Sequence, residues 1–247
     1  MRYVLALAGA LVFVPLPGPA AGLFGWDKLT YGVEWRLVRS GTVVIETNPF
    51  EGRVHLESAG LLSALFKVED LYAVRYDGNS CATDSTFDSV EGKHHRQTVV
   101  TFDHNQRKAS FVQKDLTNNT IMRSGQTDIP ECPHDLLAGL MALRGNRLEP
   151  GQSMNVTLSD GRRTGTVKVE AQEREEITTP AGTFKTIRYE VDIFNGVIYM
   201  RKGRAFLWAT DDGDRTPVEI KLRLSFPVGT VTLDLEKGAA TAKPAER

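Results

Sequence analysis

Apolar and polar residues alternate with a period of two along most of this chain. The clearest case is PVEIKLRLSF, Pro217 to Phe226, where every second residue is aliphatic and the residues between them are polar. Such alternation predicts a strand that buries one face. Similar patterns predict strands or hairpins over 29–38, 42–46, 50–58, 66–78, 96–115, 152–173, 177–193, 196–226 and 229–238.

Turn-forming residues separate these strands. Turns are predicted at 39–41, 103–106, 160–161 and 180–182, and the apolar run 59–65 predicts one or two helical turns. Roughly a dozen short, regularly spaced strands are typical of an all-β architecture. We therefore predict a mainly β protein with a single curved antiparallel sheet or an open β-barrel.

One longer helix is predicted near 133–144, within the stretch PECPHDLLAGLMALRG. Pro133 suits a first helical position, and Asp135 is favoured near a helix N-terminus. Leucines cover most of the circumference, Arg144 suits the last turn, and Gly145 is a good stop. A helix that is apolar on most sides is normally buried, so we expect this one to cover the concave face of the sheet.

The first 21 residues have the pattern of a cleavable secretory signal. A positive charge at Arg2 precedes an apolar run over 3–16 and small residues over 17–22, with cleavage predicted near Ala20–Ala21. We expect a periplasmic or secreted protein without a transmembrane segment after cleavage; an uncleaved anchor is the alternative. The rest predicts one β-rich domain over 22–238 and a disordered tail over 239–247, or alternatively two lobes with a seam near 149–151.

Charge and cysteine content narrow the class of protein further. A formal net charge of −1 argues against a nucleic-acid partner, because phosphate binding requires a clustered basic surface. The chain has 2 cysteines, Cys81 and Cys132, and an even pair in an exported protein predicts a disulfide. Closing that loop is worth on the order of 4 kcal/mol in the chain-entropy picture. A reactive thiol and a metal ligand are the alternatives.

Several segments together resemble the bacterial domain-of-unknown-function family 3108. They are CPHDLLAGLMALRG followed by LEPGQ, the opening LTYGVEWRLVRSGTVVIE, the mid-chain TPAGTFKTIRYEV, and the ending LWATDDGDRTPVEIKLRLSFPVGTVTLDL. The resemblance spans nearly the whole chain after the signal. It implies an exported protein without an agreed activity. It also implies a fold similar to the half-barrels of periplasmic lipoprotein carriers, which is an analogy of fold and not of function.

Candidates for catalysis are His134, Asp135 and Asp84. His134 and Asp135 are a potential base and orienting acid, but neighbouring helical residues do not face each other, so a third group such as Asp84 or His55 would be required. Helix capping explains Asp135 without any catalytic role.

Candidates for ligand binding are the tryptophans 26, 35 and 208, together with Arg144. Trp35 and Trp208 can line a cleft or fill core positions. Arg144 complements the predicted helix end and can pair with the acidic turn 211–214.

No metal site or cofactor is expected. Of the 5 histidines, His94 and His95 would point to opposite faces of a strand, while His95 and His104 lie at its two ends. The turn Asp211–Asp214 resembles half of a calcium loop, but it lacks the spaced glutamate of an EF-hand.

Two functions remain as hypotheses. The first is a non-enzymatic protein of the cell envelope whose curved sheet binds or shields an apolar ligand, a lipid or an envelope polymer. The second is an envelope glycan hydrolase or lyase that uses carboxylate and histidine acid–base chemistry. A scaffold that contacts other envelope proteins is a third alternative.

Overall fold

The computed structural model describes residues 27–238 except 66, 195, 197–199 and 201. The predicted signal segment 1–21, Trp26 and the predicted tail 239–247 lie outside the described residues. The strands are β1 (Asp27–Trp35), β2 (Val38–Asn48), β3 (Glu51–Ser58), β4 (Val68–Tyr76), β5 (Ala82–Glu91), β6 (His94–Asp103), β7 (Lys108–Asp115), β8 (Thr120–Asp128), β9 (Ser153–Ser159), β10 (Thr164–Thr179), β11 (Gly182–Val191), β12 (Gly203–Thr210), β13 (Pro217–Leu224) and β14 (Thr230–Lys237). The helices are α1 (Gly60–Leu65) and α2 (Leu136–Gly145).

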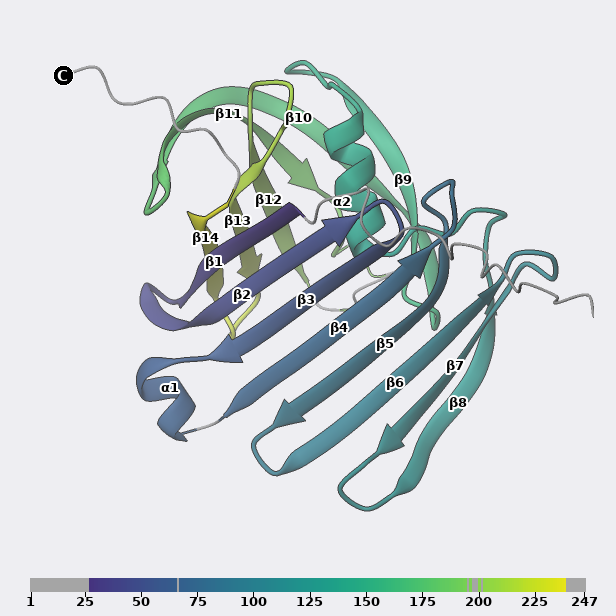
Figure 1. Ribbon diagram of the computed structural model, residues 1–247. Coiled ribbons are helices and arrows are strands. Elements are labelled where there is room, and N and C mark those ends of the chain that lie inside the picture. The colour runs from purple at the N-terminus through teal and green to yellow at the C-terminus, as the bar shows by residue number, and fades with distance from the viewer. Residues whose placement is uncertain (1–26, 66, 195, 197–199, 201, 239–247) are drawn as a thin grey trace, which may run out of the picture.

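All 14 strands belong to one antiparallel sheet in the order β8-β7-β6-β5-β4-β3-β2-β1-β14-β13-β12-β11-β10-β9. The sheet curls into two facing walls, β1–β8 and β9–β14, that are joined by the β1–β14 ladder (Figure 1). It does not close, because β8 and β9 are its two edges and do not pair with each other. The prediction of a mainly β, single curved antiparallel sheet is confirmed.

The alternating pattern of β13 places its residues as predicted. Ile220 pairs with Leu207 and Leu233, and Leu222 pairs with Ala205 and Val231 on the neighbouring strands. Paired residues share a face of the sheet, so aliphatic side chains line the concave side in a continuous band. The charged residues between them lie on the convex side.

The first hairpin turns earlier than predicted. Its loop is Arg36–Leu37 rather than 39–41, and both residues have positive φ, 52° and 67°. Consecutive left-handed residues are typical of two-residue hairpin loops, which favour Asn and Gly. Gly41 instead lies within β2, where a Cβ would meet the Glu57 carbonyl oxygen at 2.5 Å.

Helix α2 confirms the predicted helix but begins at Leu136, so the predicted start at Pro133 is wrong. Asp135 has extended backbone angles and is the N-cap, and its carboxylate accepts from the amides of Leu137 and Ala138. Residues before it are extended because they pair with strands: Ala82 N donates to Pro133 O (2.9 Å) and Ser159 N donates to His134 O (2.8 Å). The short helix α1 agrees with the helical turns predicted over 59–65.

Residues Cys132 to Asp135 therefore form a connection between the two walls on the side opposite to the β1–β14 ladder. We call this segment the clasp. Cys132 lies at disulfide distance from Cys81 at the start of β5, with Cα atoms 4.9 Å apart. Nearby, the β9–β10 turn reaches the other wall, where a Cβ on Gly161 would meet Val100 of β6 at 2.2 Å. The clasp thus fixes both walls around α2 at one place.

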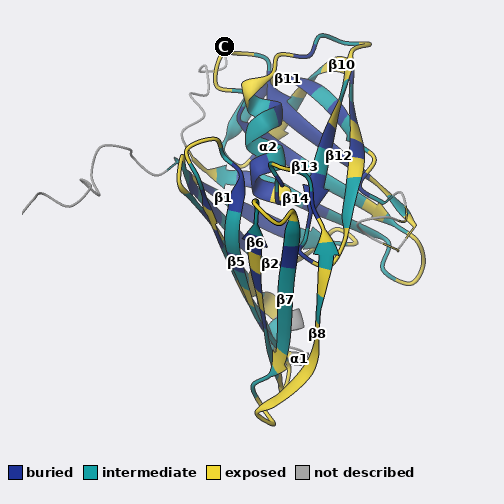
Figure 2. Ribbon diagram, turned by 90° about the vertical axis from the view of Figure 1, so that its right-hand side faces the viewer, coloured by how far each residue is buried: buried dark blue, intermediate teal, exposed yellow. Residues whose placement is uncertain are grey.

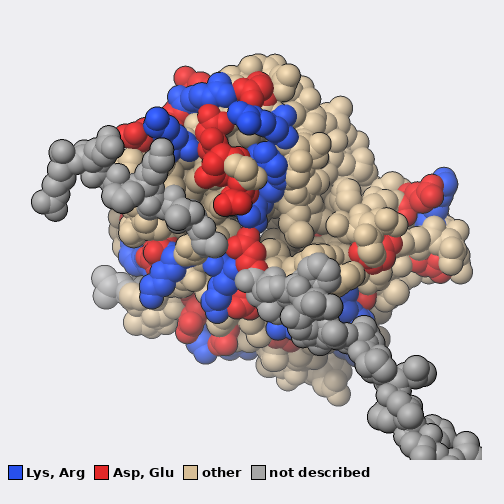
Figure 3. Space-filling model, turned by 45° about the horizontal axis from the view of Figure 1, so that its top comes forward, with Lys and Arg blue, Asp and Glu red and all other residues tan. Residues whose placement is uncertain are grey.

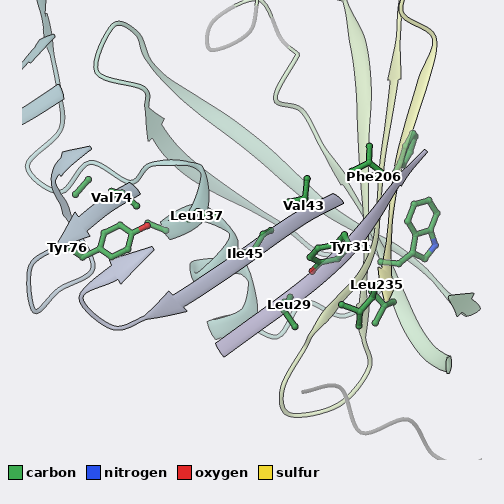
Figure 4. Packing of buried hydrophobic residues seen from close by; sticks show 14 of the residues in the cluster. Leu29, Tyr31, Val43, Ile45, Val74, Tyr76, Leu137, Phe206 and Leu235 are labelled. Atoms are coloured by element: carbon green, nitrogen blue, oxygen red, sulfur yellow. The ribbon is translucent and has the colours of Figure 1, made fainter. Parts of the chain in front are cut away.

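Buried side chains concentrate around α2, between the two walls (Figure 2). Leu137 packs with the core of the first wall, beside Val74 and Tyr76 (Figure 4), whereas Leu143 belongs to the cluster of the second wall. By contrast, β8 is exposed along most of its length. The helix therefore packs its apolar side chains between the two walls at one end of the sheet.

Candidate functional site

An apolar cavity lies between α2 and the concave faces of both walls. Its volume is about 620 Å³, and its lining includes Leu140 of α2, Val33 and Leu56 of the first wall, and Leu207 and Leu222 of the second. Almost all of the lining is aliphatic, because each contributing strand directs its apolar alternation inward. Such a space holds hydrocarbon without offering polar partners.

A second cavity of about 460 Å³ adjoins the first and is more polar. The two cavities share lining residues, among them Leu136 of α2 and Leu158 of β9. Its own lining adds Thr98 and Gln113 of the first wall and Arg162 of the β9–β10 turn. Together the two cavities provide an apolar compartment next to one that has hydroxyl, amide and charged groups.

Asp135 lies in the wall of the polar cavity, but the fold already uses its carboxylate. The residue is only 3% exposed. Its oxygens accept from the hydroxyls of Tyr76 (2.8 Å) and Tyr72 (2.9 Å) and from two helix amides. Burial, reinforced by the neighbouring carboxylate, raises the pKa of Tyr76, which keeps its hydroxyl protonated and able to donate.

The three predicted catalytic residues do not converge. His134 Nδ1 lies 3.3 Å from the Ser80 carbonyl oxygen. Asp84 lies on β5, where its neighbour Ser85 lines the polar cavity, so Asp84 points to the opposite face and binds Arg75 at 2.8 Å. Asp135 faces inward. These side chains therefore offer no shared cleft for acid–base chemistry.

The predicted ligand-binding residues also lie outside both cavities. Trp35 is at the end of β1, where its indole donates to Val228 O at 2.6 Å. Trp208 is 5% exposed on the convex side; its indole donates to Glu175 at 2.9 Å, and Lys221 Nζ lies 5.0 Å from the ring centroid. Arg144 anchors the end of α2 to Asp27 at 2.6 Å.

The clasp explains why Cys, Pro, His and Asp occur together in the sequence. Cys132 connects to Cys81, and the carbonyl oxygens of Pro133 and His134 accept from opposite walls. Asp135 then starts the helix. The backbone of His134, rather than its ring, carries the structural role.

His95, His104 and the acidic turn have partners within the protein. His95 Nε2 lies 2.7 Å from Asp88, and His104 Nε2 lies 2.7 Å from Ala82 O. Asp212 accepts from the backbone amides of Asp214 and Arg215 and so organises its own turn. Within the described part of the chain, no three His, Cys, Asp or Glu side chains are grouped as metal ligands.

Charged side chains on the outer surface are interleaved by sign. Figure 3 shows basic and acidic residues alternating on the face that it presents. In one such group Arg174 binds both Glu149 (2.6 Å) and Asp211 (2.7 Å). In the described residues, no helix has both the length and the apolar character needed to cross a membrane.

The sequence defines the class of protein. Residues 28–236 match the family DUF3108, described as a protein of unknown function, so this chain belongs to that family. This confirms the family resemblance seen in the sequence. Among curated proteins, none matches the sequence.

One solved structure shows the same kind of fold, and two others are less similar. The β-barrel-like protein of domain-of-unknown-function family DUF1849 from Brucella abortus superimposes with a TM-score of 0.57 at 9% identity, covering 87% of this chain and 98% of that one. A candidate lipoprotein from Parabacteroides distasonis gives 0.31 at 10% identity, covering 87% and 95%. A protein from Bacteroides fragilis, titled as exported and YmcC-like, gives 0.29 at 7% identity, covering 86% and 95%. Only the first TM-score supports a shared fold, and at 9% identity the similarity concerns the fold alone.

The site residues predicted from the sequence were polar or aromatic, and they did not include the aliphatic residues that line the cavity. The signal for this lining was present in strands such as β13, where alternation identifies which residues share a face. Alternation does not distinguish a packed face from a hollow one. The cavity therefore becomes visible only when both walls are in place.

Proposed function

We propose that this protein is an exported cell-envelope protein, with a single β-rich domain over 22–238, that binds an apolar or amphipathic ligand without chemical conversion. The observation that carries the proposal is the aliphatic cavity of about 620 Å³ between α2 and the two walls. A well-packed core leaves few voids larger than a water molecule, so a hollow of this size needs an occupant.

A hydrocarbon chain is the chemistry that suits this lining. Each buried methylene contributes about 0.8 kcal/mol, so roughly ten methylenes supply about 8 kcal/mol before the cost of association. The adjoining compartment with Thr98, Gln113 and Arg162 suits a polar head group. We therefore favour a lipid, or the lipid part of an envelope polymer, as the ligand.

The cysteine pair supports export. Disulfides persist in oxidising compartments such as the periplasm and are rare in the cytosol. Cys81 and Cys132 lie at disulfide distance and connect the clasp to β5. An oxidised pair is consistent with the secretory signal predicted over 1–21.

Binding can be tested with two variants of adjacent residues on β13. Leu222 lines the cavity, whereas Arg223 lies on the convex side over the ring of Phe206 at 5.1 Å. Leu222→Gln places an amide in the cavity, while Arg223→Gln places the same amide outside. Binding is measured by the fluorescence of a dansylated undecanoic acid, with native mass spectrometry for co-purified lipid.

We expect the wild type and Arg223→Gln to bind the probe, and Leu222→Gln to bind at least about tenfold more weakly. Circular dichroism would confirm that each variant is folded. A wild type that binds neither probe nor lipid, or equal binding by both variants, contradicts the proposal.

A further inference from the structure

Three neighbouring connections at one end of the sheet expose large apolar side chains. Leu37 in the β1–β2 turn is 89% exposed and Phe226 in the β13–β14 turn is 91% exposed. Val38, the first residue of β2, is 60% exposed, and Met200, in the connection between β11 and β12, is 66% exposed. Leu37 and Phe226 are the most exposed large apolar side chains among the described residues. We call these four residues the apolar tip.

The backbone at Leu37 shows that the turn itself does not require leucine. Its φ of 67° follows that of Arg36 at 52°, a combination in which Gly or Asn is least strained. A bulky side chain in this conformation is uncommon. Its presence at a fully exposed position therefore indicates a role outside the fold.

Hydrogen bonds hold the connections of the tip together. Arg36 N donates to Thr230 O at 3.0 Å, and the Arg36 guanidinium donates to Val228 O at 3.2 Å and also to Pro227 O. Ser225 N donates to Lys202 O at 3.1 Å. The connections that carry the exposed side chains are thus joined to one another by hydrogen bonds.

The tip lies next to one end of the apolar cavity. Val33 of β1, Leu224 of β13 and Val231 of β14 line the cavity, and each lies within a few residues of the turns that carry the tip. At the other end of the space, α2 fills the gap between the walls. The apolar surface therefore continues from the cavity lining to the exposed tip.

Basic side chains accompany the tip without acidic partners. Arg36, Lys202 and Arg223 are exposed. Among the described residues, none of the three has a carboxylate within ion-pair distance, unlike Arg39, which pairs with Glu236. Apolar side chains flanked by cations are suited to a bilayer with anionic lipid head groups.

From this arrangement we propose that the apolar tip docks on a lipid bilayer, with Leu37 and Phe226 inserted among the acyl chains and the cations at the head groups. The end of the cavity lined by Val33, Leu224 and Val231 then lies nearest the membrane, and we expect a lipid chain to enter there. This proposal rests on the proposed ligand class, but its test is separable from the binding test.

The experiment is flotation of the full-length mature protein with vesicles of phosphatidylcholine and phosphatidylglycerol at a 3:1 ratio. The test variant is Leu37→Ser/Phe226→Ser. The control is Phe50→Ser, at an exposed turn on the opposite end of β2. We expect wild type and control to float, and the double variant to bind about 30-fold more weakly, because two large apolar side chains are lost.

Binding of the dansylated probe in buffer is measured in parallel. Retained probe binding in the double variant, together with lost flotation, supports docking. Absence of wild-type flotation, equal flotation of the double variant, or a dimer that dissociates only in the double variant overturns it. If no protein binds the probe but flotation follows the expected pattern, docking stands and the proposed ligand binding fails.

Discussion

Replacing Asp135 by alanine should strongly destabilise the protein, because one buried carboxylate connects the helix to the first wall. It accepts from Tyr76 (2.8 Å), Tyr72 (2.9 Å), Ala138 N (2.9 Å) and Leu137 N (3.2 Å). Alanine removes the acceptor for all four donors, and at 3% exposure water has little access to replace it.

The magnitude follows from these contacts. Loss of an N-cap costs about 1 kcal/mol, and a buried hydroxyl without an acceptor costs about 1–3 kcal/mol. Tyr76 is buried and Tyr72 is half-buried, so most of the cost of an unpaired hydroxyl arises at Tyr76. The sum is about 3–5 kcal/mol in the free energy of unfolding.

The assay is urea unfolding of the oxidised protein, followed by far-UV circular dichroism and tryptophan fluorescence. Tyr76→Phe provides the matched comparison, because it removes the hydroxyl that alanine would leave unpaired. In the double variant Asp135→Ala/Tyr76→Phe, the losses should be less than additive by about 1–2 kcal/mol. An Asp135→Ala protein within 1 kcal/mol of wild type at an unchanged m-value would refute this reasoning.

Two further predictions concern the disulfide and a buried carboxyl. Cys81→Ser/Cys132→Ser should lower the free energy of unfolding by about 4 kcal/mol, since the bridge closes a loop of sequence separation 51, and thiol titration of unfolded, unreduced wild type should find no free thiol. Burial and the nearby Glu219 raise the pKa of Asp234 from 3.8 to about 6. The folded state therefore holds this proton more tightly than the unfolded state, and the stability that it contributes below pH 4 is lost as pH rises through 6. Asp234→Asn should be more stable than wild type at pH 7 by on the order of 1 kcal/mol, after allowance for solvent screening, and the difference should shrink toward pH 4 in parallel melts. A difference that is constant across this range would show that the carboxyl does not titrate in this way.

The sequence predicted the fold where one local signal dominated. On β13 the alternation identified both the strand and its faces, and the dipeptide Asp160–Gly161 identified a turn. The first hairpin was misplaced because Arg36 and Leu37 adopt left-handed backbone without being Gly or Asn. The sequence signal pointed to Gly41, whose role is a close approach within the sheet.

The start of α2 and the cavity depend on non-local contacts. Pro133 is compatible with a helix start. However, its carbonyl accepts from Ala82 on one wall, and the carbonyl of His134 accepts from Ser159 on the other. These two hydrogen bonds keep the segment extended. Likewise, the sequence predicted the cysteine pair and a capping role for Asp135 from local signals, but the contact of the His134 carbonyl with the second wall depends on the fold. The cavity could not be predicted because its volume depends on the separation of the walls.

The open edge between β8 and β9 has a mechanical consequence. The walls are continuous along the β1–β14 ladder and are held elsewhere mainly by the clasp and by the contact of Thr164 with Asp128 O (2.9 Å). The two walls are thus joined by a long ladder on one side and by a few contacts on the other. The separation of the walls away from the clasp therefore depends on the twist summed over the ladders and not on any single side chain.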